Sequence, residues 1–334
     1  MVDASRYRQV RAFTTQLASR LTVEDCQLQS MPDASPTKWH LAHTTWFFET
    51  FLLAKLDDYR VFHPRYGFLF NSYYEAVGPR HERPRRGVLS RPSLDDVRRY
   101  REHVDAAMAD ALTRGRFTAE QLALVELGLH HEQQHQELIL TDIKHAFSGN
   151  AIDPAYITAG QAEAGGEQAP SFRWVEVEEG LVEVGHAATD FAFDNESPRH
   201  RTFLSAHAIA SRPVSNREFL AFVDSGAYRE ARHWMSAGWA HVNEAAWEHP
   251  AYWRRRDGSW REFTLLGEQP LDLEAPVAHV SLYEADAYAR WAGARLPTEF
   301  EWEAFAHGRR DELEAGNFVD ARRFHPRAPH DADS

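Results

Sequence analysis

The 334-residue sequence contains one cysteine, Cys26, and no apolar run near the roughly 18 residues that a membrane-spanning helix requires. A single thiol allows no internal disulfide and excludes zinc sites built from several thiolates. The first residues, MVDASRYRQVRAF, are charged and lack the apolar stretch of a secretory signal peptide. We therefore expect a cytoplasmic protein without a membrane partner.

Basic residues are outnumbered in this chain. The chain has 37 Lys and Arg residues and 50 Asp and Glu residues, which gives a formal charge of −13 at pH 7. Such a surface repels polyanions, so nucleic acid is not an expected partner. Hydrophobic residues make up 43% of the chain, enough for a real buried core, and the length favours two domains.

Residues 1–150 predict an all-α domain. Ser93 with Asp96 resembles a capping box, and Thr118 with Gln121 fits the S/T-x-x-E/Q pattern that begins a helix. Four helices of this kind are typical of a bundle, whose core is a usual place for a metal site. The predicted helices span residues 4–20, 36–57, 93–114 and 118–148.

Composition changes divide the rest of the chain. Residues 58–92 are rich in Arg, Pro, Gly and Tyr and form a long connection, a kind of segment that is often functional. Residues 151–171 are small and polar with Pro and Gly, so they predict an interdomain linker. Residues 172–334 mix short β-like runs and many tryptophans with helical patterns near 216–225 and 282–292, which predicts an α+β domain.

The stretch LHHEQQHQEL, residues 129–138, places His131 and His135 four positions apart on a helix. Imidazoles at this spacing can chelate one metal ion. The alternative is an ordinary pair of core or surface histidines. We expect both to face the interior, because the same helix face carries Leu124, Leu127, Leu138 and Asp142.

A third ligand is available in the second predicted helix, KWHLAHTTWFFETFLL, where His43 lies among apolar and aromatic neighbours. Three neutral imidazoles leave coordination positions open on a divalent metal for dioxygen or substrate. We expect His40, His130 and His145 to support the site or to lie on the surface.

Residues His131 to His135 also fit the H-E-x-x-H pattern of zinc peptidases, in which Glu132 would be the general base. The sequence does not continue into the extended H-E-x-x-H-x-x-G-x-x-H pattern, and the pentapeptide alone matches many sequences by chance. A zinc hydrolase is therefore kept as an alternative, which predicts a zinc preference and loss of activity in Glu132→Gln.

These motifs resemble those of the ergothioneine-biosynthesis sulfoxide synthases, also called hercynine oxygenases. The resemblance implies an N-terminal DinB-like four-helix bundle over residues 1–150. For residues 172–334 it implies a C-type-lectin-like α+β domain of the formylglycine-generating-enzyme or sulfatase-modifying-factor type. It rests on SPTKWHLAHTTWFFETFLL, FNSYYEAVGPRHERPRRGVLSRP and HHEQQHQELILTDIKHAF in the first domain, and on PVSNREFLAFV, PVAHVSLYEADAYARWAGARLPTEFEWEAFAHG and GNFVDARRFHP in the second.

The resemblance also assigns site residues. The family's three Fe(II) ligands fall on His43, His131 and His135. Arg80 and Arg83 match positions that bind the carboxylates of the thiol substrate, and Gln134 matches a position that contacts hercynine. Without the resemblance, a solvated basic turn is the better explanation of Arg80 and Arg83, and a helix-surface amide explains Gln134 as well as a substrate contact does. Candidates for an aromatic contact with the quaternary ammonium of hercynine are Trp46, Phe47, Tyr73 and Tyr74.

The implied function is that of a non-haem iron oxidoreductase that uses O2 to join hercynine to γ-glutamylcysteine or cysteine as a sulfoxide. A relative that acts on a selenium compound, as in selenoneine synthesis, is an alternative. Formylglycine generation is not expected, because its paired active-site cysteines have no counterpart in a chain with one cysteine.

The chain departs from the family's pattern after ARLPTEFEWEAFAHG. The family continues through Gly-Asp-x-Trp-Glu-Trp and Arg-Gly-Gly-Ser segments, whereas this chain ends in FHPRAPHDADS. We therefore expect the second domain to be incomplete, and we assign no catalytic tyrosine. Either the chain is a catalytically impaired metal-binding truncation, or a second polypeptide supplies the rest. The sequence leaves this choice and the oligomeric state open.

Overall fold

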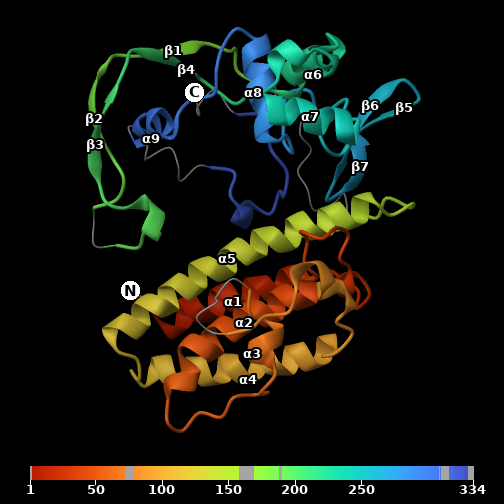
Figure 1. The fold of residues 1–334 in the computed structure, drawn as a ribbon. Helices are drawn as coiled ribbons and strands as arrows, with labels where there is room; N and C mark the ends of the chain where they lie inside the picture. The colour runs from red at the N-terminus through yellow and green to blue at the C-terminus, as the bar shows by residue number, and fades with distance from the viewer. Residues whose placement is uncertain are drawn as a thin grey trace. The chain divides into compact units, whose positions relative to one another are not determined.

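The computed structural model describes residues 2–72, 78–157, 169–187, 190–307, 309 and 316–329. The chain divides into two compact units, Met1–Ile157 and Thr158–Ser334. In its described part the first unit is helical, whereas the second mixes helices with strands (Figure 1). The predicted order, a helical domain followed by an α+β domain, is confirmed. Within the predicted linker, residues 158–168 lie outside the described residues.

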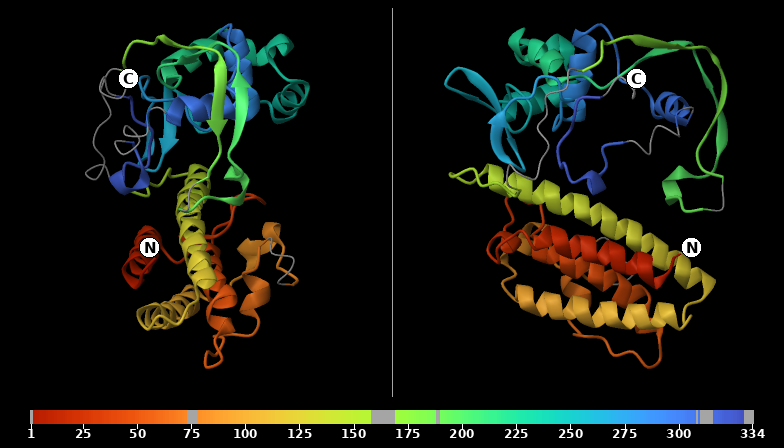
Figure 2. Two further views of the ribbon diagram at one scale, coloured as in Figure 1. Left: turned by 90° about the vertical axis from the view of Figure 1, so that its left-hand side faces the viewer. Right: turned by 180° about the vertical axis from the view of Figure 1, so that it is seen from behind.

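The first unit is a bundle of α1 (Ala4–Ala18), α2 (Thr37–Phe51), α4 (Leu94–Thr113) and α5 (Ala119–Ser148). Helix α2 packs against α4 and α5, and α1 packs against the same two helices, so the four enclose one core (Figure 2). Both predicted capping boxes are present, at Ser93 with Asp96 and at Thr118 with Gln121. In the described part of the chain, no helix is long and apolar enough to cross a membrane.

The end of the second helix differs from the prediction. Helix α2 ends at Phe51 rather than near residue 57, and the 3-10 helix η2 (Leu53–Lys55) follows it. Within the connection 58–92, the described residues contain α3 (Tyr66–Leu69) and the 3-10 helix η4 (Arg83–Val88). The side chain of Gln29, which follows the 3-10 helix η1 (Asp25–Gln27), fastens η4 by donating to the Arg83 carbonyl at 2.8 Å.

The buried face of α5 also differs from the predicted one. Leu138, which we expected in the interior, is 40% exposed. His135 is buried and His131 is half-buried, so the two histidines border the core stripe instead of forming its centre. The prediction failed because two polar residues of the stripe, which look like surface residues in the sequence, are buried with hydrogen-bond partners. The stripe consists of Val125, Leu129, Glu132, Gln136, Ile139 and Ile143.

The strands of the second unit form antiparallel pairs. β1 (Trp174–Val177) pairs with β4 (His207–Ala210), and β2 (Gly180–Val184) pairs with β3 (His200–Leu204), near the 3-10 helix η6 (Asp194–Glu196). β5 (Trp253–Arg256), β6 (Ser259–Thr264) and β7 (Gly267–Pro270) form a separate sheet in that order. Such short pairs bury little surface by themselves, so the helices and loops must supply much of the core.

Aromatic side chains form that core. The predicted helical patterns correspond to α6 (Asn216–Asp224) and α8 (Leu282–Trp291), whereas α7 (Ser236–Ala245) and α9 (Glu299–His307) were not predicted. The described residues also form the 3-10 helices η7 (Ala227–Arg229), η8 (Ala231–His233) and η10 (Val319–Ala321). The buried cluster contains Phe219, Phe222, Tyr228, Trp234 and Trp253, as expected for a domain held by aromatic packing.

The close packing of α5 on α2 gives a first prediction. A Cβ atom at Gly128 would lie 2.7 Å from ring atoms of both Phe47 and Phe48, which are fully buried. We expect Gly128→Ala to lower the free energy of unfolding by about 1–3 kcal/mol, because overpacking outweighs the gain in helix propensity. Gly67→Ala in α3, where no atom lies within 4 Å of the added carbon, is the control. Urea unfolding of both variants measures this, and a stabilised Gly128→Ala would contradict it.

Candidate metal centre

Three histidines bring their Nε2 atoms together between α2 and α5. His131 Nε2 lies 3.2 Å from His43 Nε2 and 3.1 Å from His135 Nε2. Ligand atoms of the three rings all lie within 4.8 Å of one another. Two nitrogens bound to one cation at about 2.1 Å, with an angle between 90° and tetrahedral, lie roughly 3.0–3.4 Å apart. Both Nε2–Nε2 distances from His131 therefore fit a metal ion that it shares with His43 and His135.

The surroundings of His43 fix its ring. Its Nδ1 donates a hydrogen bond to the carbonyl oxygen of Phe70 at 2.6 Å, which leaves Nε2 as the bare nitrogen. Trp39 stacks on the ring with a centroid distance of 4.5 Å and an angle of 13°, and Trp46 stacks at 5.5 Å. These contacts hold the ring in the plane from which Nε2 reaches α5.

Burial keeps all three imidazoles neutral. It lowers the pKa of His43 and of His135 well below the ordinary value, and neighbouring histidines and Arg86 lower both further. Burial also lowers the pKa of His131, to about 4, and outweighs the opposing effect of Glu132. The neutral imidazole is the form that binds metal. A set of three such nitrogens suits divalent iron as well as zinc, copper or nickel.

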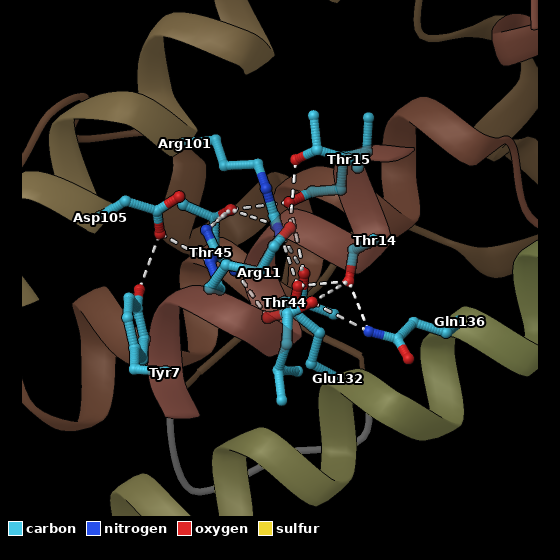
Figure 3. Close-up of polar contacts among 12 residues, drawn as sticks. Tyr7, Arg11, Thr14, Thr15, Thr44, Thr45, Arg101, Asp105, Glu132 and Gln136 are labelled. Atoms are coloured by element: carbon cyan, nitrogen blue, oxygen red, sulfur yellow. Dashed lines mark hydrogen bonds and ion pairs between the residues drawn. The ribbon is translucent and has the colours of Figure 1, made fainter. Parts of the chain in front are cut away.

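Glu132 belongs to a different site, on the side of α5 that faces α1 and α4 (Figure 3). Its fully buried carboxylate accepts hydrogen bonds from Arg11 at 2.8 Å, from Thr14 Oγ1 at 2.6 Å, and from Arg101. Burial would raise the pKa of this carboxyl, but Arg101 and Arg11 outweigh it and lower the pKa to about 2. A carboxylate held in this way is poorly suited to act as the general base of a zinc peptidase.

The predicted substrate-binding residues lie on separate elements. Arg80 is exposed and donates to the Ser72 carbonyl at 2.8 Å, after α3. Arg83, at the start of η4, is half-buried and donates to the Asp33 carbonyl ahead of α2. Gln134 lies next to His135 in sequence, and its side chain is exposed on α5.

Two of the four aromatic candidates for a contact with hercynine are among the described residues. Trp46 and Phe47 are buried core residues, so packing rather than ligand contact accounts for them. Tyr73 and Tyr74 lie outside the described residues. Of the other histidines, His130 contacts Arg6 and His145 contacts Ser30, whereas His40 is buried against His135 and Asp142.

Sequence reasoning missed Arg86. Its buried guanidinium lies 3.4 Å from the ring centroid of Trp39, the residue that stacks on His43. It also donates to Ser35 Oγ at 2.9 Å and to Ser72 Oγ at 3.3 Å. In the sequence it is one of several arginines in a basic segment, and no local signal separates it from its exposed neighbour Arg85.

Loss of a ligand tests the centre directly. We expect His131→Ala and His135→Ala each to weaken binding of Fe(II), or of Co(II) as a spectroscopic probe, by at least about 100-fold, more than loss of a supporting partner would. Anaerobic titration followed by absorption measures this. His130→Ala, a change beside His131 on a different face of α5, is the matched control and should bind as the unaltered chain does. Equal affinity in all three variants would refute the site.

The Glu132 network gives a prediction about stability. Glu132→Gln leaves the buried guanidinium of Arg101 without its carboxylate and Arg11 with Asp105 alone, so we expect a loss of about 3–5 kcal/mol in the free energy of unfolding at neutral pH. Because the pKa of Glu132 is lower in the folded chain, its contribution is complete above about pH 4.5 and is lost as the pH falls toward about 2. The difference in the free energy of unfolding between the unaltered chain and Glu132→Gln should therefore become smaller as the pH is lowered.

The control for this prediction is Glu126→Gln. Glu126 pairs with Arg6 at 2.8 Å, but both side chains are about one-third exposed. Removing such a pair typically costs less than about 1 kcal/mol. Chemical unfolding at pH 7 and pH 3.5 compares the variants, and a Glu132→Gln protein as stable as Glu126→Gln would contradict the assignment.

Comparisons with known proteins cover both units. Residues 6–139 match the DinB superfamily, and residues 161–334 match the sulfatase-modifying factor enzyme 1-like domain. The hercynine oxygenase of Mycolicibacterium thermoresistibile is 36% identical over 290 residues, which are 84% of this chain and 61% of that protein. The hercynine oxygenase of Mycobacterium tuberculosis is 32% identical over 307 residues, 90% of this chain and 68% of that protein.

A more distant relative, ergothioneine biosynthesis protein 1 of Schizosaccharomyces pombe, is 27% identical over 245 residues, 64% of this chain and 29% of that protein. The chain thus spans about three-fifths to two-thirds of the length of its bacterial relatives. Both domain matches occur in the order that the structure shows, and the identity extends through the histidine-bearing helices to the second unit. The chain belongs to the hercynine oxygenase family, with a DinB-type helical domain followed by a sulfatase-modifying-factor-type domain.

Proposed function

We propose that this chain is an iron(II)- and O2-dependent sulfoxide synthase that joins hercynine to γ-glutamylcysteine or cysteine in ergothioneine biosynthesis. The observation that carries the proposal is the convergence of three Nε2 atoms, from His43, His131 and His135, at spacings that fit one metal ion. Relatives named hercynine oxygenase and ergothioneine biosynthesis protein support the reaction class.

Three histidine ligands leave room on the metal for exogenous ligands. Iron(II), when bound there, would supply the redox chemistry that couples O2 reduction to oxidation of sulfur and formation of the carbon–sulfur bond. The protein's part is to keep the three imidazoles neutral, through burial, and to hold them on two packed helices. The position of Glu132 in the arginine network favours this reading over a zinc hydrolase, which needs a free carboxylate at the metal.

The substrate residues complete the proposal. The guanidinium groups of Arg80 and Arg83 would bind the carboxylates of the thiol substrate, because this group pairs with a carboxylate through two hydrogen bonds. Gln134, exposed beside His135, would donate a hydrogen bond to hercynine or accept one from it. Glu82, exposed between the two arginines in sequence, would add a negative charge that weakens carboxylate binding or alters the choice of thiol.

Turnover tests the proposal. The chain is loaded anaerobically with one equivalent of Fe(II), then given O2, hercynine and γ-glutamylcysteine or cysteine, while oxygen uptake and product mass are followed. We expect a sulfoxide that contains both substrates. Iron binding without product would favour the alternative of a metal-binding chain without this activity, and product formed only with a selenium donor would favour a selenoneine-type relative.

Variants in the basic segment make the same assay specific. Arg80→Ala should raise KM for the thiol by about 10–100-fold, because a charge-assisted pair is lost. Arg85→Ala is the matched control, since Arg85 is an exposed arginine of the same segment. Equal effects of the two substitutions would contradict the role of Arg80. Zinc-dependent hydrolysis that survives the removal of O2 would contradict the function itself.

A further inference from the structure

His40, a second histidine of α2, contacts the candidate ligand His135 through the Nδ1 atoms of the two rings. His40 lies one helical turn before His43 and is only 2% exposed. Its Nδ1 is 2.7 Å from Nδ1 of His135, and its Nε2 is 3.0 Å from Oδ2 of Asp142. Asp142 lies two turns beyond His135 on α5, because seven residues are close to two turns. The three side chains form a hydrogen-bonded relay that starts and ends on α5.

The carboxylate sets the direction of every proton in this relay. An ionised Asp142 only accepts hydrogen bonds, so His40 carries its proton on Nε2. A neutral His40 then has a lone pair on Nδ1, and the His135 nitrogen facing it must be the donor. His135 consequently carries its proton on Nδ1 and presents a bare Nε2, the atom that lies 3.1 Å from His131 Nε2.

Asp142 is itself held in place. The backbone N–H of Ser35 donates to the same Oδ2 at 2.8 Å. Ser35 directly precedes Pro36, the N-cap of α2, and Pro36 provides no side-chain cap for that helix. A single carboxylate therefore ties the start of α2 to α5 and also orients His40.

The three candidate ligands differ in this support. His43 has its Nδ1 proton fixed by the Phe70 carbonyl, and His135 has its own fixed by the relay. Among the described residues, Nδ1 of His131 is buried and has no hydrogen-bond partner. Two rings thus have a set tautomer, and the third is the one that can adapt.

We propose that His40 and Asp142 are positioning residues that hold His135 in its metal-binding tautomer and orientation. The proposal deepens the proposed function, on whose metal centre it rests, and requires no turnover. Hydrogen-bond partners of metal-bound histidines commonly contribute about 10–100-fold to metal affinity. His40 and Asp142 are placed to contribute this amount through a single ligand.

The tautomers can be read in the metal-free protein. Long-range 1H–15N correlation spectra of chain labelled with 15N-histidine distinguish protonation on Nδ1 from protonation on Nε2, with signals assigned through His135→Ala and His40→Phe. We expect His135 to be protonated on Nδ1 and His40 on Nε2. A proton on Nε2 of His135 would overturn the proposal. Because neither metal nor substrate is present, this outcome is independent of whether the chain makes a sulfoxide.

Metal titration then tests the consequence. His40→Phe keeps a ring in the space but removes the acceptor, so Co(II) should bind about 10–100-fold more weakly and with a changed d–d absorption band. His40→Asn places an acceptor oxygen near the former Nδ1 and should recover most of the affinity. The matched control is His145→Phe, on α5 but bonded to Ser30, which should bind as the unaltered chain does.

Two results of the metal titration would overturn the proposed relay. His40→Asn binding as weakly as His40→Phe would show that volume, not the hydrogen bond, matters, and would overturn the relay. An equal loss in His145→Phe would point to general damage to α5 and would also count against it. Thermal unfolding of each variant separates loss of fold from loss of the bond. If His40→Phe does not fold, the tautomer measured in the unaltered chain still decides the question.

Discussion

The buried carboxylate of Glu132, shared between Arg11 and Arg101, is the constraint on which the candidate site depends. Successive residues of an α-helix are rotated by about 100° around its axis. Once Glu132 is anchored toward α1 and α4, His131 must occupy the adjoining face, where α2 carries His43. The ion pairs of Glu132 with Arg11 and Arg101 thus set the rotation of α5, the helix that carries His131 and His135, without a hydrogen bond to either histidine.

Such a network is costly to bury and stabilises only when it is complete. Arg11 also binds Asp105 at 2.6 Å, so two cations are balanced by two carboxylates, and Thr14 satisfies a further lone pair of Glu132. A small rotation of α5 would leave charges unpaired in the core, at a cost of several kcal/mol. The network therefore acts less as a source of stability than as a selector of one helix orientation.

Features that depend on residues close together in the sequence could be predicted, whereas contacts between residues far apart in the sequence could not. Capping boxes at Ser93 and Thr118 and the spacing of the histidines are local in sequence, and they appear as predicted. Two partners of Glu132, Arg11 and Thr14, are more than 100 residues away in the sequence, and no spacing rule connects them to it. Arg86 and Arg85 look alike in the sequence, yet only Arg86 is buried, because the stacking surface of Trp39 exists only after folding. The helix α7 was missed for a local reason, since no side chain caps its start.

The proposed site combines two kinds of support. The three histidines are carried by α2 and α5, whose packing at Gly128 leaves no space for even one extra carbon atom. The proposed substrate residues Arg80 and Arg83 are on the connection between α3 and α4 and bind backbone carbonyls, contacts that do not depend on the bundle core. Metal geometry tolerates errors of only a few tenths of an ångström, whereas substrate loops tolerate replacement. Under the proposed function, a change of sulfur or selenium donor therefore proceeds through Arg80, Arg83 and the exposed residues near them, while the histidines, Arg86, the relay behind His135 and the Glu132 network stay as they are.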